Sequence, residues 1–198
     1  MLRILIADDH TVVRKGLKQI LLDEFPAAEI AEVADAEELI KKVMTDKWDV
    51  VVSDLSMPGR SGLDALQQIK ISHPELPVLI LSIHPEEQYA LRALKSGASG
   101  YLSKDTAPDE LVKAVRKVLL GKKYISQSIA EKLASTFSSD TVMNPHESLS
   151  DREFDVMKLL ANGKSVSEIA EMLSLSVTTV STYRARVMVK MDLKSNSD

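Results

Sequence analysis

Five short runs of aliphatic and β-branched residues alternate with helical patterns over the first two thirds of the chain. The strand-like runs lie at Ile4 to Ala7, Glu29 to Val33, Val50 to Ser53, Val78 to Leu81 and Gly100 to Leu102. The helical patterns follow them at Val12 to Asp23, Ala36 to Thr45, Leu63 to Ser72, Glu86 to Ser96 and Pro108 to Leu120. Strands and helices that alternate in this way form a parallel sheet with helices on both faces. The pattern predicts an α/β domain with a five-stranded, doubly wound parallel sheet.

Composition narrows the class of protein further. The chain has 198 residues, of which 44% are hydrophobic and 27% charged, with a formal net charge of −4. A protein that binds nucleic acid through its overall charge would be strongly positive, so a net charge of −4 argues against that class. The sequence has no cysteine, which excludes disulfides and thiol catalysis. No apolar run reaches the ~18–20 residues that span a bilayer. We expect a cytoplasmic protein that does not contact membranes.

The pattern changes after residue 121. Residues 122–148 hold a modest amphipathic stretch at Ile129 to Phe137 and then a polar tract at residues 138–147, which is the best candidate for a linker. From residue 149 to 198 every signal is helical. Ser150 and Ser165 each precede a glutamate by three residues, which is the spacing of a capping box. The expected domains are therefore residues 1–121, a connection at 122–148, and a small all-α domain at 149–198.

Charged and hydroxyl side chains gather at the ends of the predicted strands. Asp8 and Asp9 follow the first strand, Asp54 the third, Ser82 the fourth and Lys104 the fifth. The carboxyl ends of parallel strands meet at one edge of a sheet, where such folds bind their ligands. Three carboxylates so close together repel one another unless a hard cation neutralises them, and oxygen ligands suit Mg²⁺. The cluster predicts a site that holds Mg²⁺ and a phosphoryl group.

Each of these residues also has a simpler interpretation. Asp8 and Asp9 could cap the following helix, Asp54 could begin a turn, and Lys104 could be a solvated surface lysine. Their joint occurrence at the ends of three strands favours the shared site.

The residues of this region resemble those of a known domain. Asp8-Asp9, the segment from Asp54 to Gly59, Ser82, Gly97-Ala98 and the segment from Tyr101 to Lys104 are similar to the flavodoxin-like receiver domain of two-component response regulators, over residues 1 to about 120. The resemblance implies that Asp54 accepts a phosphoryl group from a sensor histidine kinase. It implies that Asp9, Asp54 and the backbone carbonyl of Ser56 hold Mg²⁺, while Asp8 acts behind these ligands or through water. It also implies that Ser82 and Tyr101 form a switch pair and that Lys104 contacts the phosphoryl group.

The last helical pattern, Val177 to Met191, has two distinct faces. Val180, Tyr183, Val187 and Met191 share one face and should pack inward. The helix carries three cations and no acid. Small outward residues with cations beside them can enter the major groove of DNA, although an ordinary amphipathic helix with a basic solvated face gives the same pattern. The predicted DNA contacts are Thr178, Ser181, Thr182, Arg184, Ala185, Arg186 and Lys190.

Further residues of this region decide between those interpretations. The segments Leu149 to Glu153, Gly163 to Ser165, Glu168 to Ala170 and Thr179-Val180 resemble the LuxR-type helix-turn-helix, and the whole chain resembles the NarL/FixJ class of response regulators. Members of that class usually continue with one more helix, and this chain stops where that helix would begin. Either the chain has been shortened or the natural protein lacks the helix. We expect weaker dimerisation of the DNA-binding domain in its absence.

The sequence thus predicts a phosphorylation-dependent DNA-binding regulator of transcription. Its expected partners are a sensor histidine kinase, double-stranded promoter DNA and, when phosphorylated, a second copy of itself. It is expected to catalyse no reaction beyond its own phosphorylation and dephosphorylation. Two alternatives remain open: a phosphorylation-controlled module that binds protein, and a small Mg²⁺-dependent phosphatase that forms an aspartyl phosphate.

Overall fold

The computed structural model describes residues 1–58, 60–131 and 149–193. The described residues form two compact units, one on each side of residues 132–148. The predicted linker at 138–147 and most of the predicted helix at Ile129 to Phe137 lie outside the described residues.

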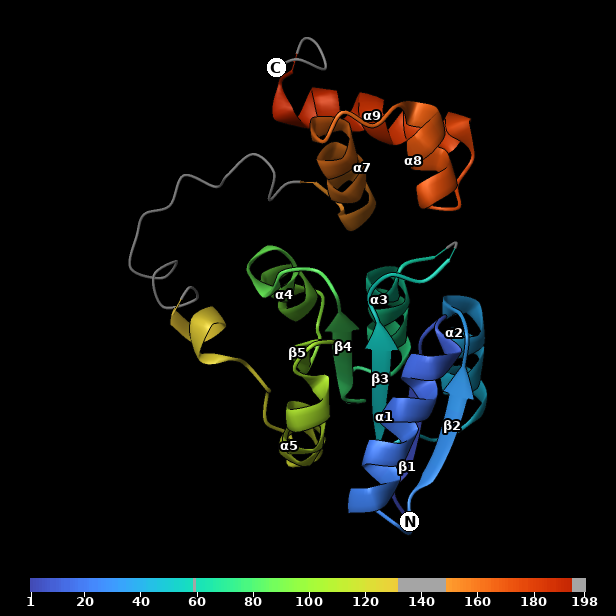
Figure 1. Ribbon diagram of the computed structural model, residues 1–198, viewed down its shortest axis with the longest axis vertical. Helices are drawn as coiled ribbons and strands as arrows, with labels where there is room; N and C mark the ends of the chain where they lie inside the picture. Colours follow the sequence, from blue (N-terminus) through green and yellow to red (C-terminus); the bar gives the residue numbers. More distant parts are fainter. Residues whose placement is uncertain (59, 132–148, 194–198) are drawn as a thin grey trace. The chain divides into compact units, whose positions relative to one another are not determined.

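The first unit is built on a five-stranded parallel sheet in the order β2-β1-β3-β4-β5 (Figure 1). Every pair of neighbouring strands is parallel. The strands are β1 (Arg3–Ala7), β2 (Glu29–Val33), β3 (Val50–Asp54), β4 (Val78–Ser82) and β5 (Gly100–Ser103). The order reverses between β1 and β3, because the chain first adds β2 on one side of β1 and then the remaining strands on the other. The predicted doubly wound sheet is confirmed.

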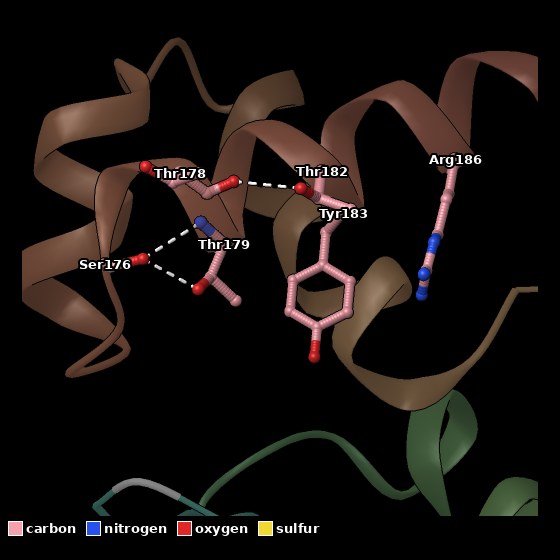
Figure 2. Close-up of a pocket in the computed structure, with 6 residues that line it drawn as sticks. All are labelled: Ser176, Thr178, Thr179, Thr182, Tyr183 and Arg186. Atoms are coloured by element: carbon pink, nitrogen blue, oxygen red, sulfur yellow. Dashed lines mark hydrogen bonds between the residues drawn. The ribbon is translucent and has the colours of Figure 1, made fainter.

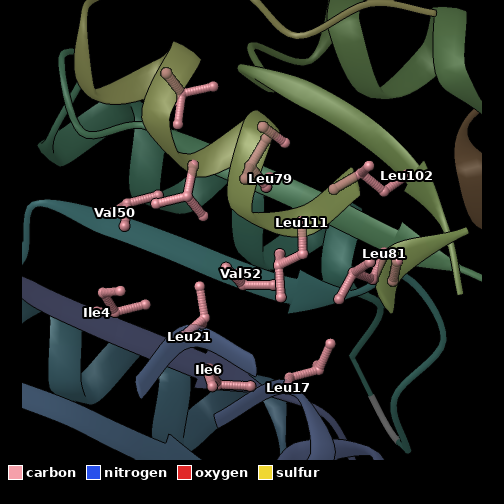
Figure 3. Close-up of a cluster of buried hydrophobic side chains, with 14 residues drawn as sticks. Ile4, Ile6, Leu17, Leu21, Val50, Val52, Leu79, Leu81, Leu102 and Leu111 are labelled. Atoms are coloured by element: carbon pink, nitrogen blue, oxygen red, sulfur yellow. The ribbon is translucent and has the colours of Figure 1, made fainter. Parts of the chain in front are cut away.

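Helices cover both faces of this sheet. They are α1 (Thr11–Glu24), α2 (Ala36–Thr45), α3 (Gly62–Ser72), α4 (Glu86–Lys95) and α5 (Ala107–Leu119). Alternate strand residues point to opposite faces, so Ile4 and Ile6 of β1 pack with Leu17 and Leu21 of α1 in one core, which α5 completes with Leu111 (Figure 3). On the same strand Leu5 is fully buried as well. The central strands are therefore buried on both sides, as their continuous apolar sequences predict.

The chain continues to pack on this unit beyond α5. The Tyr124 N–H donates to the Ser99 carbonyl at 2.8 Å. Residue Tyr124 thereby forms an isolated parallel β-bridge with Gly100. The Lys123 ammonium donates to the Ala98 carbonyl at 2.7 Å, and residues 127–131 are helical with Ile129 buried. The start of the predicted connection thus lies along the edge of β5.

The second unit consists of α7 (Asp151–Ala161), α8 (Val166–Met172) and α9 (Val177–Met191). Both predicted capping boxes are present, because Ser150 and Ser165 accept from the third residue of their helices and the glutamates there accept in return. Gly163 follows α7 with a φ of +77°, the left-handed conformation that a glycine adopts readily. Val156, Ile169, Ala170 and Val180 form the centre of a small core.

Candidate functional site

The strand register brings the predicted pocket residues to one edge of the sheet. Ala7 pairs with Ser53, so the next residues along the two strands are Asp8 and Asp54. Ser82 pairs with Ser103, which Lys104 follows. All of these positions lie at the carboxyl ends of β1, β3, β4 and β5, beside the point where the strand order reverses.

Lys104 lies between two buried carboxylates. Its Nζ is 2.7 Å from Asp8 Oδ2 and 2.9 Å from Asp54 Oδ2. The side chains of Asp8 and Asp54 are 1% and 4% exposed, and that of Lys104 is 13% exposed. Asp9 is more accessible, and its Oδ1 lies 2.7 Å from His10 Nδ1. Because the carboxylates are buried, their interactions with the ammonium are stronger than those of a surface pair.

Burial and charge oppose each other in this pocket. Burial raises the pKa of Asp54 above its usual value, although the hydrogen bond and the charge of Lys104 act to lower it. Burial alone would lower the pKa of Lys104, but hydrogen bonds to Asp8 and Asp54 outweigh burial and hold it above its usual value. Lys104 therefore stays charged at neutral pH. It lies beside Asp54, whose ionised form is destabilised by burial.

The donor atoms fit a divalent cation. One ligand atom from each of Asp8, Asp9, His10 and Asp54 lies within 4.8 Å of the others. Three of the four residues offer carboxylate oxygens, the ligands that Mg²⁺ prefers. Ser56 lies two residues beyond Asp54, and its backbone N–H donates to the Asp54 carboxylate. The role of the Ser56 carbonyl as a metal ligand stays a prediction.

Three further predicted residues gather around His84, a residue for which the sequence predicts no role. The backbone N–H of His84 donates to Ser82 Oγ at 2.9 Å, and its carbonyl accepts from the Tyr101 hydroxyl at 3.0 Å. Its Nε2 lies 3.1 Å from Ser56 Oγ. Ser82 and Tyr101 are buried. The position of His84, two residues after Ser82, was the available signal in the sequence.

Gly62 is required next to Asp54. A Cβ atom at position 62 would lie 2.0 Å from the Asp54 carbonyl oxygen, so no larger residue fits without a backbone shift. The Gly62 N–H donates to the Leu55 carbonyl at 2.8 Å, which closes the loop after β3. This close approach fixes the backbone that carries Asp54.

The second unit presents α9 with the two faces that the sequence predicts. Val180 and Val187 are buried, whereas most of the predicted DNA-contacting residues are exposed: Thr178, Ser181, Thr182, Ala185, Arg186 and Lys190. Arg184 is half-buried. A shallow pocket of about 300 Å³ lies beside the first turns of α9, lined by Ser176, Thr178, Thr179, Thr182, Tyr183 and Arg186 (Figure 2).

Lys190 has a structural partner. Its Nζ lies 2.7 Å from Glu153 Oε2, and the Glu153 side chain is almost fully buried. Glu153 also accepts from the backbone N–H of Ser150 at 2.8 Å. The ion pair joins α9 to the start of α7, and a contact of Lys190 with DNA stays a prediction.

Two features together define a class of regulator. The first unit has a parallel sheet of this order with a lysine between buried aspartates. The second unit has a helix, α9, that exposes small polar and basic residues. Residues 4–116 match the model of the response regulator receiver domain, and residues 147–198 match that of the bacterial regulatory proteins of the luxR family. The chain belongs to the response regulators of two-component systems, in the NarL/FixJ class. It is a DNA-binding response regulator that is phosphorylated on an aspartate, and its family is not one of conventional enzymes.

Relatives match over nearly the full chain. Response regulator UvrY of Escherichia coli K12 is 38% identical over 194 residues, which cover 98% of this chain and 89% of UvrY. Oxygen regulatory protein NreC of Staphylococcus haemolyticus is 40% identical over 204 residues, covering 100% of this chain and 94% of NreC. Among solved structures, RcsB from Salmonella enterica serovar Typhimurium bound to promoter rprA with the phosphomimetic BeF₃⁻ has a TM-score of 0.64 at 27% identity, covering 100% and 96%.

These results confirm the predicted family and fold. The structure brings Asp8, Asp9, Asp54 and Lys104 together in one pocket and Ser56, Ser82 and Tyr101 around His84. Within the ranges that the structure describes, none of the helices has the length and apolar character to cross a membrane.

Proposed function

We propose that Asp54 is the phosphoryl acceptor and that its phosphorylation, by a sensor histidine kinase, controls binding of α9 to promoter DNA. The observation that carries this proposal is the pair of buried carboxylates, Asp8 and Asp54, held within 3 Å of the Lys104 ammonium. The Lys104 ammonium supplies one positive charge next to Asp54, and a bound cation would supply the rest that the phosphoryl oxygens need.

The transfer is a substitution at phosphorus. An Oδ atom of ionised Asp54 forms the new P–O bond while the P–N bond to the kinase's histidine breaks, and the bond electrons leave with the imidazole. Asp9, Asp54 and the Ser56 carbonyl would hold Mg²⁺, with Asp8 acting behind these ligands or through water, and the ion would supply positive charge for the phosphoryl oxygens. Lys104 is already placed to donate to the same oxygens when it exchanges a carboxylate partner for the phosphoryl group.

The switch follows from the groups around His84. The Ser82 hydroxyl accepts from His84 N–H, and the same hydroxyl can donate to a phosphoryl oxygen on Asp54. The Tyr101 hydroxyl is bonded to the carbonyl of the same residue. The segment between β4 and α4 contains His84, whose carbonyl accepts from the Tyr101 hydroxyl. A shift of Ser82 toward the phosphoryl group would therefore move this segment and, with it, the Tyr101 contact. We assign the change of population between two receiver states to this segment.

The DNA-binding step and self-association rest on α9 and on the relatives. RcsB has been solved as two dimers bound to two parallel DNAs, at 28% identity to this chain. By the same arrangement, the phosphorylated protein would bind promoter DNA as a homodimer in the cytoplasm. Arg186 and Arg184 would contact phosphates, and Thr178, Ser181, Thr182 and Ala185 would face base edges.

Binding of the full chain to random-sequence duplex DNA tests this function. We expect a small acyl phosphate with Mg²⁺ to strengthen binding by the wild type and to leave Asp54→Asn unchanged. The affinity should fall steeply as salt rises, since bound phosphates release counterions. Equal stimulation of the Asp54→Asn variant, or the lack of any binding to duplex DNA at low salt, would contradict the proposal.

A further inference from the structure

We propose that α9 reads the methyl groups of thymine through one stripe of four residues, so that the DNA sites of this protein are rich in A·T pairs. The methyl stripe consists of Thr178, Thr182, Ala185 and Val189. The inference rests on the proposed DNA binding and adds the class of base that the helix recognises.

The methyl stripe is a continuous exposed face. Its residues stand at positions i, i+4, i+7 and i+11, which share one side of a helix. All four are exposed, and Val189 is 81% exposed, whereas Val180 and Val187 on the opposite face are 0% and 2% exposed. The stripe extends for about 16 Å, the length of about five base-pair steps. Packing within the second unit accounts for the buried valines but not for Val189.

The chemistry of the stripe favours thymine. The Thr182 hydroxyl donates to the Thr178 carbonyl at 3.0 Å, so its proton is used within the helix and its methyl group remains for contact (Figure 2). Ala185 and Val189 offer methyl groups only. Guanine is read by arginine or lysine and adenine by asparagine or glutamine, while apolar side chains contact the thymine methyl group in the major groove. The stripe contains none of those four polar residue types.

The cations of α9 lie beside the stripe and not on it. Arg186 extends to the same side of α9 as Tyr183, and both line the pocket of hydroxyl groups (Figure 2). Lys190, the residue after Val189, is paired with Glu153. A backbone phosphate bound by the Arg186 guanidinium would lie at the edge of the stripe, where the pocket is bordered by Thr178 and Thr182. Charge therefore positions α9 on the duplex and leaves the methyl stripe to face the bases.

Deoxyuridine substitution tests this inference directly. Sites would first be selected from a random duplex library with the full chain, a small acyl phosphate and Mg²⁺. Uracil pairs as thymine does and lacks only the methyl group, so replacing the invariant thymines by deoxyuridine should weaken binding about three- to tenfold. The Val189→Ala variant should lose part of this discrimination. The Val12→Ala variant, altered at an equally exposed valine in the receiver, should keep all of it.

Two failures are distinguishable. Equal affinities for the thymine and uracil duplexes, or selected sites whose invariant positions are all G·C, would overturn the thymine assignment and leave the DNA-binding function intact. A chain that selects no duplex at all would overturn the proposed function, and the thymine assignment with it.

Discussion

At the residue scale, Lys104 sets the electrostatics of the receiver pocket. One ammonium contacts two carboxylates that are almost fully buried, and a buried carboxylate without a partner is costly. The sequence predicts that Lys104 contacts a phosphoryl group. It does not reveal that Asp8 and Asp54 share the lysine before any phosphoryl group arrives, because strand spacing places the backbone ends and not the side-chain atoms.

The charge of Glu153 has a structural role in the second unit, because it pairs with Lys190 and accepts from the Ser150 N–H. Burial acts to raise the pKa of Glu153, but hydrogen bonds from Lys190 and Ser150 outweigh burial and hold its pKa below the usual value. A lowered carboxyl pKa stabilises the folded state above the ordinary glutamate pKa of about 4.3, and the stabilisation is lost as the pH falls through the folded-state value. The second unit should therefore lose stability in acid.

The Glu153→Gln variant tests that role. It keeps an acceptor for the Ser150 N–H and loses the ion pair, so we expect protection of α7 and α9 against amide hydrogen exchange to fall at pH 7 by about 1 kcal/mol. The difference from the wild type should shrink toward pH 4, after correction for intrinsic exchange rates. Glu171→Gln, altered on the exposed side of α8, should change little. A pH-independent difference would contradict the account.

At the element scale, most boundaries follow from sequence. The predicted helices at Ala36 to Thr45 and Val177 to Met191 and the predicted strand at Glu29 to Val33 match the structure at both ends. Other elements differ by about one residue at an end, as α3 does by beginning at Gly62, because capping geometry and not periodicity decides the terminal turn. The sequence also predicts that Asp8, Asp9, Asp54 and Lys104 lie together, because parallel strands end at the same edge of a sheet.

Contacts between distant loops could not be predicted in this way. The bridge of Tyr124 with Gly100 and the contacts of His84 with Ser56, Ser82 and Tyr101 each join segments far apart in sequence. Such pairs depend on side-chain and loop geometry that no periodic pattern encodes. The ion pair of Lys190 with Glu153 belongs to the same group. The sequence alone does not show this ion pair, so it predicts only a DNA contact for Lys190.

Two helical glycines provide a matched test of the loop after β3. A Cβ at Gly62 meets the Asp54 carbonyl oxygen at 2.0 Å, whereas a Cβ at Gly16 of α1 meets nothing within 4 Å. We expect Gly62→Ala to lower the free energy of unfolding by about 1–3 kcal/mol or more, because the backbone of Asp54 or of the start of α3 must move to make room for the added methyl group. Gly16→Ala should raise it by about 0.5–1 kcal/mol, since alanine is the better helix former.

Denaturant unfolding followed through the fluorescence of Trp48, the one tryptophan in the chain, measures both variants. Equal effects of the two substitutions would mean that the close approach at Gly62 does not fix the Asp54 backbone.

At the scale of the whole molecule, each unit has its own core and its own task. The receiver carries the acidic pocket and the loop with His84, and the second unit carries α9. The sequence predicts both tasks because each depends on a local pattern. Regulation requires that the phosphoryl group on Asp54 favour one receiver state by its differential interactions, since a group that interacts equally with both states shifts nothing. Regulation by this route therefore requires first that Asp54 be the residue that is modified.

Mass spectrometry of the full chain treated with a small acyl phosphate and Mg²⁺ tests this claim most directly. We predict one added phosphoryl group on the peptide that contains Asp54, removed by hydroxylamine as an acyl phosphate should be. The adduct should be absent from Asp54→Asn and present on Asp105→Asn, which alters an exposed aspartate next to Lys104. An adduct of the same yield on Asp54→Asn, or none on the wild type, would contradict the account.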